Sequence, residues 1–185
     1  MAAPSGTTWG STVGSKGRIG LYTSLSSTNT ETTLTVQIWF WSKYSVSDSN
    51  NKLYYDNLAS SGKASTSKGE VSINTTVATG SGWSTSNQKK LKTYTKTYDR
   101  TTSAQTRYLY AKLSGIDVVG GTMSVSKTVS IPKLPTYTIK YNANGGSSTP
   151  DDQTKYYGKA ITLAKAISRT GYTFQGWGTS ASDTS

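Results

Sequence analysis

The sequence predicts an all-β protein, in which an antiparallel β-sandwich is followed by a second, smaller β module. The 185 residues include 13 Tyr and 5 Trp beside abundant Thr and Ser, and Thr and aromatic residues favour pleated, half-exposed strands. Apolar and polar residues alternate through most of the chain, which is the period of a strand with one buried face. Two prolines, Pro132 and Pro135, interrupt the alternation and indicate a stiff linker. We therefore predict a sandwich domain over residues 1–131, a linker over 132–136 and a module over 137–185.

The first domain begins with a small, polar segment, residues 1–17, in which Trp9 is the one large anchor. We expect a loose arm, or a first strand pinned by Trp9. Alternation then predicts strands near residues 18–26, 32–44, 53–55, 71–77, 89–100, 108–113 and 123–131. Lys127 shares the parity of the apolar residues around it, so we expect a bulge or bend there. Short strands at turn spacing resemble an immunoglobulin- or fibronectin type III-like sandwich at the level of pattern.

The clearest strand, residues 32–44, has two unlike faces. The aliphatic face is predicted to lie in the core and carries Leu34, Val36, Ile38 and Phe40. The opposite face carries Trp39 and Trp41. An aromatic pair two residues apart can stack on sugar rings, but packing beneath a neighbouring strand or loop is the commoner role. Trp83, in a Gly- and Ser-rich loop, is either an exposed contact residue or a lid folded back on the sandwich edge.

The segment 89–100 is unusual because one face of the predicted strand is both basic and aromatic. Strict alternation places on this face Lys90, Lys92, Tyr94, Lys96, Tyr98 and Arg100. One interpretation is an edge strand whose lysines block edge-to-edge pairing. The other is a binding strip for an anionic polymer, with charges for phosphates or carboxylates and rings for stacking. These six residues and Trp83 are the candidate binding residues.

The chain is basic and lacks the usual catalytic groups. Its net charge is +11, and residues 1–132 hold 14 basic against 6 acidic residues. This excess favours anionic partners, or serves solubility alone, while no recognition motif supports nucleic acid. There is no His and no Cys, and we find no paired carboxylates, phosphate-binding loop, calcium motif or membrane-length apolar run. We therefore expect a non-enzyme with no catalytic residue, metal or cofactor, and no membrane partner.

The module near the C-terminus carries several separate motifs in a fixed order. Alternation predicts strands near residues 137–141, 160–163 and 172–174. The motifs are Asn142-Ala-Asn-Gly-Gly, Tyr157-Gly, Arg169-Thr-Gly-Tyr-Thr-Phe and Gly176-Trp. Residues 137–177 thereby resemble the internalin B-type (Listeria–Bacteroides) repeat. The resemblance implies a small β-grasp-like module without enzymatic chemistry, found in bacterial surface proteins and in tail or fibre proteins of phages that infect Gram-positive hosts.

This module departs from the repeat pattern in two places. Ile167 stands where such repeats often have a proline, and the chain stops at Ser185, before the last strands that such repeats include. We therefore expect a truncated module. Tyr172 and Trp177 are expected to pack inside it, because a module of ~45 residues has few other large groups to bury.

The expected function follows from the repeat and from the N-terminus. The polar-rich strands of the first domain resemble siphovirus structural proteins of phages of Gram-positive hosts. Residues 1–6 lack the basic and apolar regions of a signal peptide, which favours a virion protein, assembled in the host cytoplasm, over an adhesin. We expect a tail or head fibre component for host-surface attachment.

The expected partners of such a fibre component are other virion proteins, further copies of the chain, and an anionic cell-wall polymer or glycan of a Gram-positive host. Two alternatives remain. One is a fragment of an adhesin at the bacterial cell surface. The other is a carbohydrate-binding module of a cell-wall enzyme, which would show a shallow groove lined by Trp39 and Trp41 or by Trp83.

Overall fold

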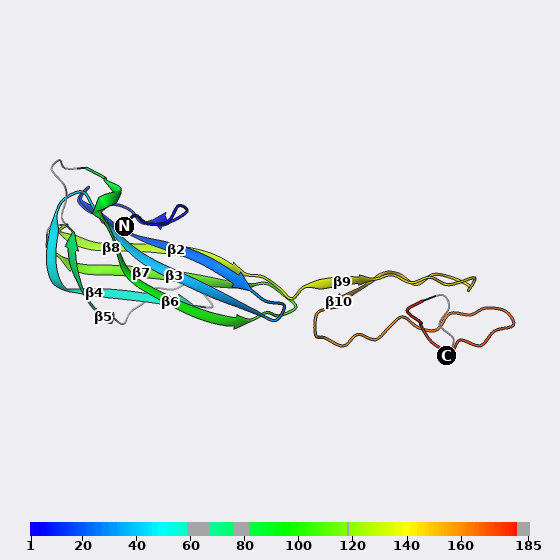
Figure 1. Ribbon diagram of the computed structural model, residues 1–185. Helices are drawn as coiled ribbons and strands as arrows, with labels where there is room; N and C mark the ends of the chain where they lie inside the picture. The colour runs from blue at the N-terminus through cyan, green and yellow to red at the C-terminus, as the bar shows by residue number, and fades with distance from the viewer. Residues whose placement is uncertain (59–66, 76–81, 118, 181–185) are drawn as a thin grey trace. The chain divides into compact units, whose positions relative to one another are not determined.

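The chain divides into two compact units, Met1–Lys133 and Leu134–Ser185. The computed structural model describes residues 1–58, 67–75, 82–117 and 119–180, which Figure 1 colours in chain order. The last residues of the predicted module, 181–185, lie outside the described residues. The division falls within the proline-containing segment 132–136, and strand structure resumes at Thr136.

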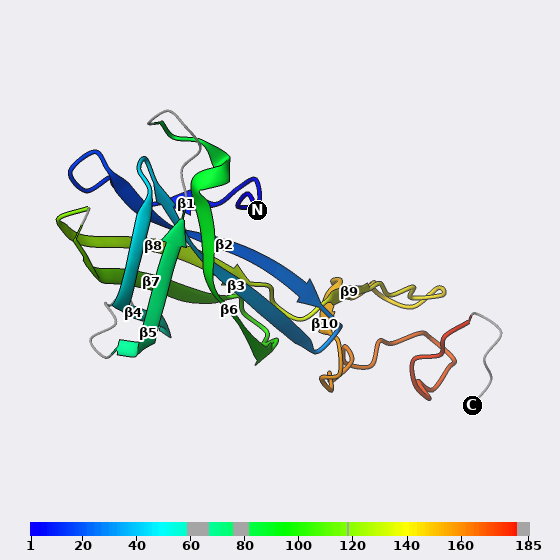
Figure 2. The same ribbon diagram turned by 60° about the vertical axis from the view of Figure 1, so that its left-hand side comes forward.

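Two four-stranded antiparallel sheets form the first unit. In one sheet the order is β1-β2-β3-β6, and its strands are Thr8–Trp9, Gly17–Ser27, Glu31–Ser42 and Gln88–Asp99. In the other the order is β5-β4-β7-β8, and its strands are Ser67–Thr75, Val46–Leu58, Gln105–Ile116 and Gly121–Ile131. A short 3₁₀ turn, η1 at Thr85–Asn87, leads into β6. The two sheets form the two layers visible in Figures 1 and 2.

This division of strands confirms the predicted all-β sandwich. When β1 is set aside, the first, second and fifth strands of the sandwich share one sheet, and the other four share the second sheet. Every pairing is antiparallel. The arrangement is that of a fibronectin type III-like sandwich, in which the chain crosses between sheets after its second, fourth and fifth strands.

The core lies between the two sheets and is built by alternate residues, as the sequence pattern predicts. The aliphatic face of β3 is fully buried through Leu34, Val36, Ile38 and Phe40. It packs in one cluster with the inward side chains of β7, which are Leu109, Ala111 and Leu113. Each such large aliphatic side chain stabilises the fold by about 1.5–3 kcal/mol relative to an exposed one. Both sheets are held together by this shared apolar layer.

Lys127 corrects one expectation, because no bulge occurs there. β8 pairs with β7 without a shift at this point, with Leu109 opposite Lys127. The lysine therefore faces the same side as Val125 and Val129, and burial lowers its pKa. β8 is an edge strand, where an inward-pointing charge discourages pairing with another chain. The long aliphatic stem lies along apolar surface while the ammonium reaches the edge of the sandwich.

The second unit contains one two-stranded antiparallel sheet, made by β9 at Thr136–Ile139 and β10 at Gln153–Tyr156. The sequence correctly placed β9, but the partner strand is the polar segment 153–156 and not the predicted 160–163. Polar side chains hold this pairing, because the Tyr141 hydroxyl bonds the Gln153 side chain and also accepts from the Ala164 N–H at 2.9 Å. Among its described residues, Leu134 is the one buried side chain.

The two aromatic residues predicted to pack in this unit behave differently. Trp177 is half-buried, with its ring 4.6 Å from that of Tyr141 and 5.3 Å from that of Phe174. Its indole N–H donates to the Ala164 carbonyl at 2.8 Å. Tyr172, in contrast, is 67% exposed, so the expectation that it packs inside is wrong. It closes a β-bridge with Arg169, and the guanidinium carbon of that residue lies 4.2 Å from the centroid of the Tyr172 ring.

Candidate binding surface

The candidate binding surface is the outer face of the β1-β2-β3-β6 sheet, the side turned away from the core. Strand register decides which side chains share this face. Arg18 lies directly opposite Trp41, Gly20 opposite Trp39, and Trp39 opposite Lys90. Residues directly opposite each other in an antiparallel pair point to the same side of the sheet. The outer face therefore brings together tryptophan, arginine and lysine from β2, β3 and β6, the strands that lie side by side in Figure 2.

Three tryptophans surround one guanidinium on this face. The Arg18 carbon Cζ lies 4.2 Å from the ring centroid of Trp41 and 5.0 Å from those of Trp9 and Trp83. The Trp41 ring also contacts the other two indoles, with centroids 5.1 Å from Trp9 and 5.3 Å from Trp83. We call these four residues the Arg18 cage. Each cation–π contact of this kind contributes about 0.5–2 kcal/mol, depending on how far water is excluded.

The N-terminal arm supplies one wall of the cage. Trp9 on β1 pairs with Gly20 on β2, where a Cβ atom would come within 2.6 Å of the indole. Ala3 meanwhile donates its N–H to the Gln88 side chain at 2.6 Å, and Gln88 belongs to β6. Because β2 and β3 lie between β1 and β6, the arm crosses the outer face. This crossing explains why Trp39 is only 1% exposed on a face that points away from the core.

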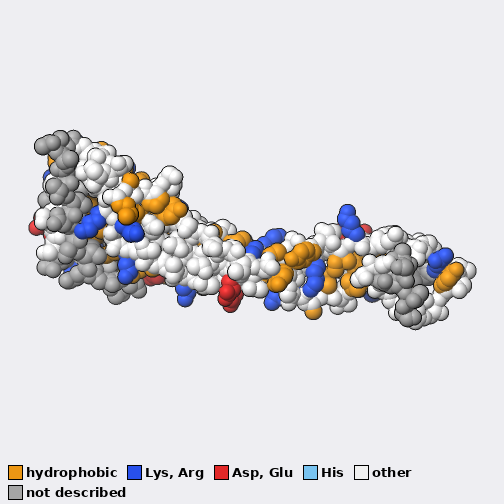
Figure 3. Space-filling model, viewed as in Figure 1, with side chains coloured by type: hydrophobic (Ala, Val, Ile, Leu, Met, Phe, Trp, Pro, Cys, Tyr) orange, Lys and Arg blue, Asp and Glu red, His pale blue; other side chains and the backbone are white. Residues whose placement is uncertain are grey.

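The other two walls come from β3 and from the loop before β6. The indole N–H of Trp41 donates to the Ser84 carbonyl at 2.9 Å, which ties that loop to the sheet. Trp83 precedes Ser84 and remains 36% exposed, at the rim of the cage. The indole N–H of Trp39 instead donates to the Gln37 side chain at 3.0 Å, and the Trp39 side chain is buried and not available to a ligand. In Figure 3, hydrophobic and basic side chains gather over the region where Figure 1 shows the N-terminal segment.

Arg18 is electrostatically unusual. Burial lowers its pKa, although an arginine remains charged at any physiological pH. Its Nε atom is buried and has no hydrogen-bond partner within the described residues. The indole faces stabilise the charge of the guanidinium, but they do not accept its in-plane N–H groups. The described residues contain no cluster of three or more acidic side chains that could hold a metal ion. No helix among them is long and apolar enough to span a membrane.

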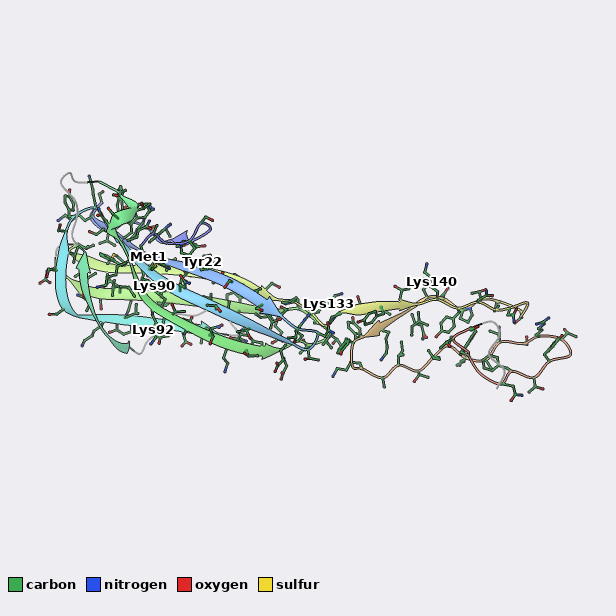
Figure 4. The ribbon with its side chains drawn as sticks, viewed as in Figure 1. Met1, Tyr22, Lys90, Lys92, Lys133 and Lys140 are labelled. Atoms are coloured by element: carbon green, nitrogen blue, oxygen red, sulfur yellow. The ribbon has the colours of Figure 1, made fainter. Side chains whose placement is uncertain are left out.

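The predicted strip along β6 does not form one continuous face. The register of β3 with β6 shifts between Ile38 and Trp39, so that Ile38 faces Lys92 while Trp39 faces Lys90. The extra residue, Leu91, is a bulge, and it turns Lys90 to the outer face while Lys92 stays on the core side (Figure 4). Lys92 and Lys96 remain exposed, because β6 lies at the edge of its sheet. The segment is therefore an edge strand, as the first of the two interpretations predicts.

Tyr94 and Tyr98 join the two sheets instead of lining an open strip. Tyr94 stacks on Tyr55 of β4, with centroids 5.0 Å apart, and desolvation raises its pKa well above the usual range. The Tyr98 hydroxyl accepts a hydrogen bond of 2.6 Å from the Asn57 side chain, also on β4. The guanidinium of Arg107, on β7, lies 4.7 Å from the Tyr98 ring. These tyrosines close one edge of the sandwich.

Arg100 serves as a clamp at the end of the first unit. Its guanidinium donates to the main-chain carbonyls of Thr28, Pro132 and Lys133. Its own N–H bonds the Thr30 carbonyl at 2.6 Å. The arginine thus joins the β2–β3 turn to the segment that leaves β8, and three of its five guanidinium donors are used within the protein. Of the predicted site residues, the structure leaves Lys90, Lys92, Lys96 and Trp83 open to solvent.

Sequence reasoning missed Arg18 and the role of Trp9 in the cage. The sequence feature that could have placed Arg18 beside Trp41 is the hairpin between β2 and β3. A turn at residues 28–31 fixes the pairing of Ser27 with Thr32, and the same register then sets Arg18 opposite Trp41. The approach of Trp9 has no comparable signal, because β1 is only two residues long.

Comparison with known families supports the interpretation of the second unit. Residues 137–185 match the family model of the Listeria-Bacteroides repeat domain. This agrees with the resemblance drawn from the motifs of residues 137–177, and repeats of this type occur in surface-associated bacterial proteins. Searches of curated proteins and of solved structures gave no match to the chain.

Proposed function

We propose that this chain is a structural protein of a phage particle, a tail or head fibre component that displays β domains toward a host surface. The observation that carries the proposal is the match of residues 137–185 to a repeat of surface-associated proteins, placed after a sandwich of fibronectin type III-like arrangement. Its partners are other virion proteins, further copies of itself, and an anionic wall polymer or glycan of a Gram-positive host. Its place is the virion, after assembly in the host cytoplasm.

The charge of the first unit supports attachment to an anionic surface. Lys90 on the outer face, with Lys92 and Lys96 at the sheet edge, is exposed to solvent. Exposed charges bind a polyanion weakly one by one, and repetition along a fibre multiplies the weak contacts. Attachment of this kind needs no catalytic group, and we assign the chain none.

The second candidate is a bacterial surface protein. It is favoured by the same family match, because the repeat occurs in surface-associated bacterial proteins. The carbohydrate-binding module of a cell-wall enzyme is a third candidate, favoured by the exposed Trp83 at the rim of the Arg18 cage. Both alternatives retain recognition of an envelope polymer as the task of the chain.

Localisation separates the first two candidates. Particles and intact cells from an induced culture of the source bacterium are purified and probed with antibodies against residues 1–133. We expect the chain in density-purified particles, with label on their tails or heads in electron microscopy. Detection only in the wall fraction of uninduced cells would refute the virion assignment and support the bacterial surface protein.

A further inference from the structure

The chain holds four arginines, and three of them are bonded to the protein. Arg100 donates to the carbonyls of Thr28, Pro132 and Lys133. Arg107 donates to the side chain and the carbonyl of Asn57, and Arg169 donates to the Asn144 carbonyl at 2.9 Å. Within the described residues Arg18 donates to no protein acceptor, and its buried Nε is unpaired. A guanidinium has five N–H donors in a fixed plane, and no described acceptor of the protein takes any of those of Arg18.

Among the side chains that the structure describes, no acidic group on the outer face neutralises Arg18. Its cross-strand neighbour is Trp41, and the acidic residues of this sheet, Glu31 and Asp99, lie opposite each other in the β3–β6 register at the far end of the sheet. A buried polar group without a partner destabilises the fold, because it has lost its hydrogen bonds to water. The cation–π contacts with the three indoles offset part of this destabilisation. An oxyanion placed in the plane satisfies the remaining donors, because arginine matches carboxylate and phosphate geometry.

Trp83 supplies the second half of a ligand site. Its ring centroid is 5.0 Å from Arg18 Cζ, yet the residue remains 36% exposed. An exposed indole offers a flat apolar surface for the C–H face of a sugar or polyol, while its neighbour offers charge. Lys90 lies on the same outer face, opposite Trp39, and adds positive potential. An apolar plate beside an unpaired guanidinium fits a ring that carries an anionic group.

We propose that the Arg18 cage binds an anionic sugar or polyol unit of an envelope polymer, with its carboxylate or phosphate on the Arg18 N–H donors and its ring on Trp83. The proposal deepens the attachment role and rests on it for the choice of polymer. Carboxylate and phosphate share the chemistry that Arg18 recognises, so the probes separate the two sources. The cage is thus a single-unit site, distinct from the lysines at the β6 edge.

The test uses the whole chain and three soluble probes: oligogalacturonate for carboxylate, poly(glycerol phosphate) for phosphate, and a neutral glucan of similar length. Binding is measured by calorimetry, together with the NMR signal of the Arg18 Nε–H. We expect saturable binding of at least one anionic probe and a shift of the Arg18 signal during the titration. The neutral glucan should leave that signal unmoved.

Two variants and one matched control complete the test. Arg18→Lys keeps the charge but loses the planar fork, and should weaken binding about tenfold. Trp83→Ala removes a rim side chain from a loop and should weaken it by a similar factor. Lys140→Gln removes one exposed charge from the second unit, outside the candidate binding surface, and should change affinity less than about twofold. Near-UV circular dichroism checks that each variant is folded.

Several outcomes would overturn the inference: no binding of either anionic probe, an unmoved Arg18 signal, equal binding of the neutral glucan, or a larger loss with Lys140→Gln than with Arg18→Lys. Binding to oligogalacturonate alone assigns a carboxylate, and binding to poly(glycerol phosphate) alone assigns a phosphate. The particle localisation experiment does not depend on the cage. A chain found in virions that binds no anionic probe would therefore refute the cage and leave the proposed function standing.

Discussion

Gly20→Ala tests whether the N-terminal arm is packed on the outer face as described. The new Cβ would lie 2.6 Å from Trp9 Cε3 and 2.9 Å from both Trp9 Cδ2 and Thr7 Cγ2. Ordinary contacts of this kind are 3.4–4 Å, so the indole must retreat by about 1 Å or leave the sheet. We expect the arm to move and β2 to stay in place, because Gly20 is paired with Trp39 in the middle of β3.

The expected cost follows from the contacts that Trp9 makes. Losing its ring contact with Trp41 costs about 0.5–1.5 kcal/mol, and losing its contact with Arg18 about 0.5–2 kcal/mol. Against this loss, alanine in a strand interior stabilises the fold by about 0.5–1 kcal/mol relative to glycine. We therefore expect the first unit to lose about 1.5 kcal/mol of unfolding free energy, the middle of a range of about 0–3 kcal/mol. The urea midpoint should fall by about 1 M, given slopes of about 1–3 kcal/mol per M for domains of this size.

The assay is urea unfolding followed by tryptophan fluorescence, together with limited proteolysis of the arm. Released indoles should shift the emission of the folded state to the red, since both Trp9 and the covered Trp39 would meet water. Gly82→Ala is the matched control, because a Cβ there meets nothing within 4 Å. If Gly20→Ala proved as stable and as blue-emitting as Gly82→Ala, the crossing of the arm over the outer face would be refuted.

Three further perturbations address other parts of the molecule. Tyr98→Phe removes the acceptor of the Asn57 side chain and should cost about 1–2 kcal/mol in urea unfolding; an unchanged midpoint would argue against the inter-sheet bond. Lys127→Val should raise the unfolding midpoint of the first unit and also increase light scattering with concentration, because the inward charge on an edge strand is gone; a variant that stays monomeric at all concentrations would contradict this role. Trp177→Ala removes a half-buried ring and its bond to the Ala164 carbonyl, so hydrogen exchange should accelerate across residues 134–180 and stay unchanged in the first unit; protection retained in 134–180 would show that the ring is dispensable.

The fold class and the core face of β3 could be predicted because alternation in sequence has a direct structural meaning. Side chains in a strand point to opposite sides in turn, so a run such as Leu34, Val36, Ile38 and Phe40 identifies the buried face without knowledge of the partner strands. The turn between β2 and β3 likewise follows from local chemistry. These features depend on residues that are close in sequence, so they can be predicted from the sequence of one chain.

The candidate site could be predicted only in part, because it depends on register and on distant segments. One extra residue at Leu91 rotates the preceding part of β6, and no local signal separates it from regular alternation. Tyr94 looks like a binding residue in sequence, but its partner Tyr55 comes from the other sheet. In the second unit the polar residues Gln153–Tyr156 gave no strand signal, yet they pair with β9. A side-chain bond between Tyr141 and Gln153 supports this pairing, and alternation does not show such a bond. The resemblance of residues 137–177 to a repeat family rested on motif order and not on strand placement, and the family model matches residues 137–185.

The clamp made by Arg100 bears on how the first unit responds to mechanical load. In the proposed fibre role, the chain is pulled along its length whenever an attached particle is dragged by flow. Tension that enters at Lys133 meets the Arg100 guanidinium before it reaches the pairing of β8 with β7, because that guanidinium holds the carbonyls of Pro132 and Lys133. The same side chain passes the load to the β2–β3 turn through Thr28. Force is thereby shared between both sheets, so that they are pulled together, whereas an unclamped β8 would peel away one hydrogen bond at a time.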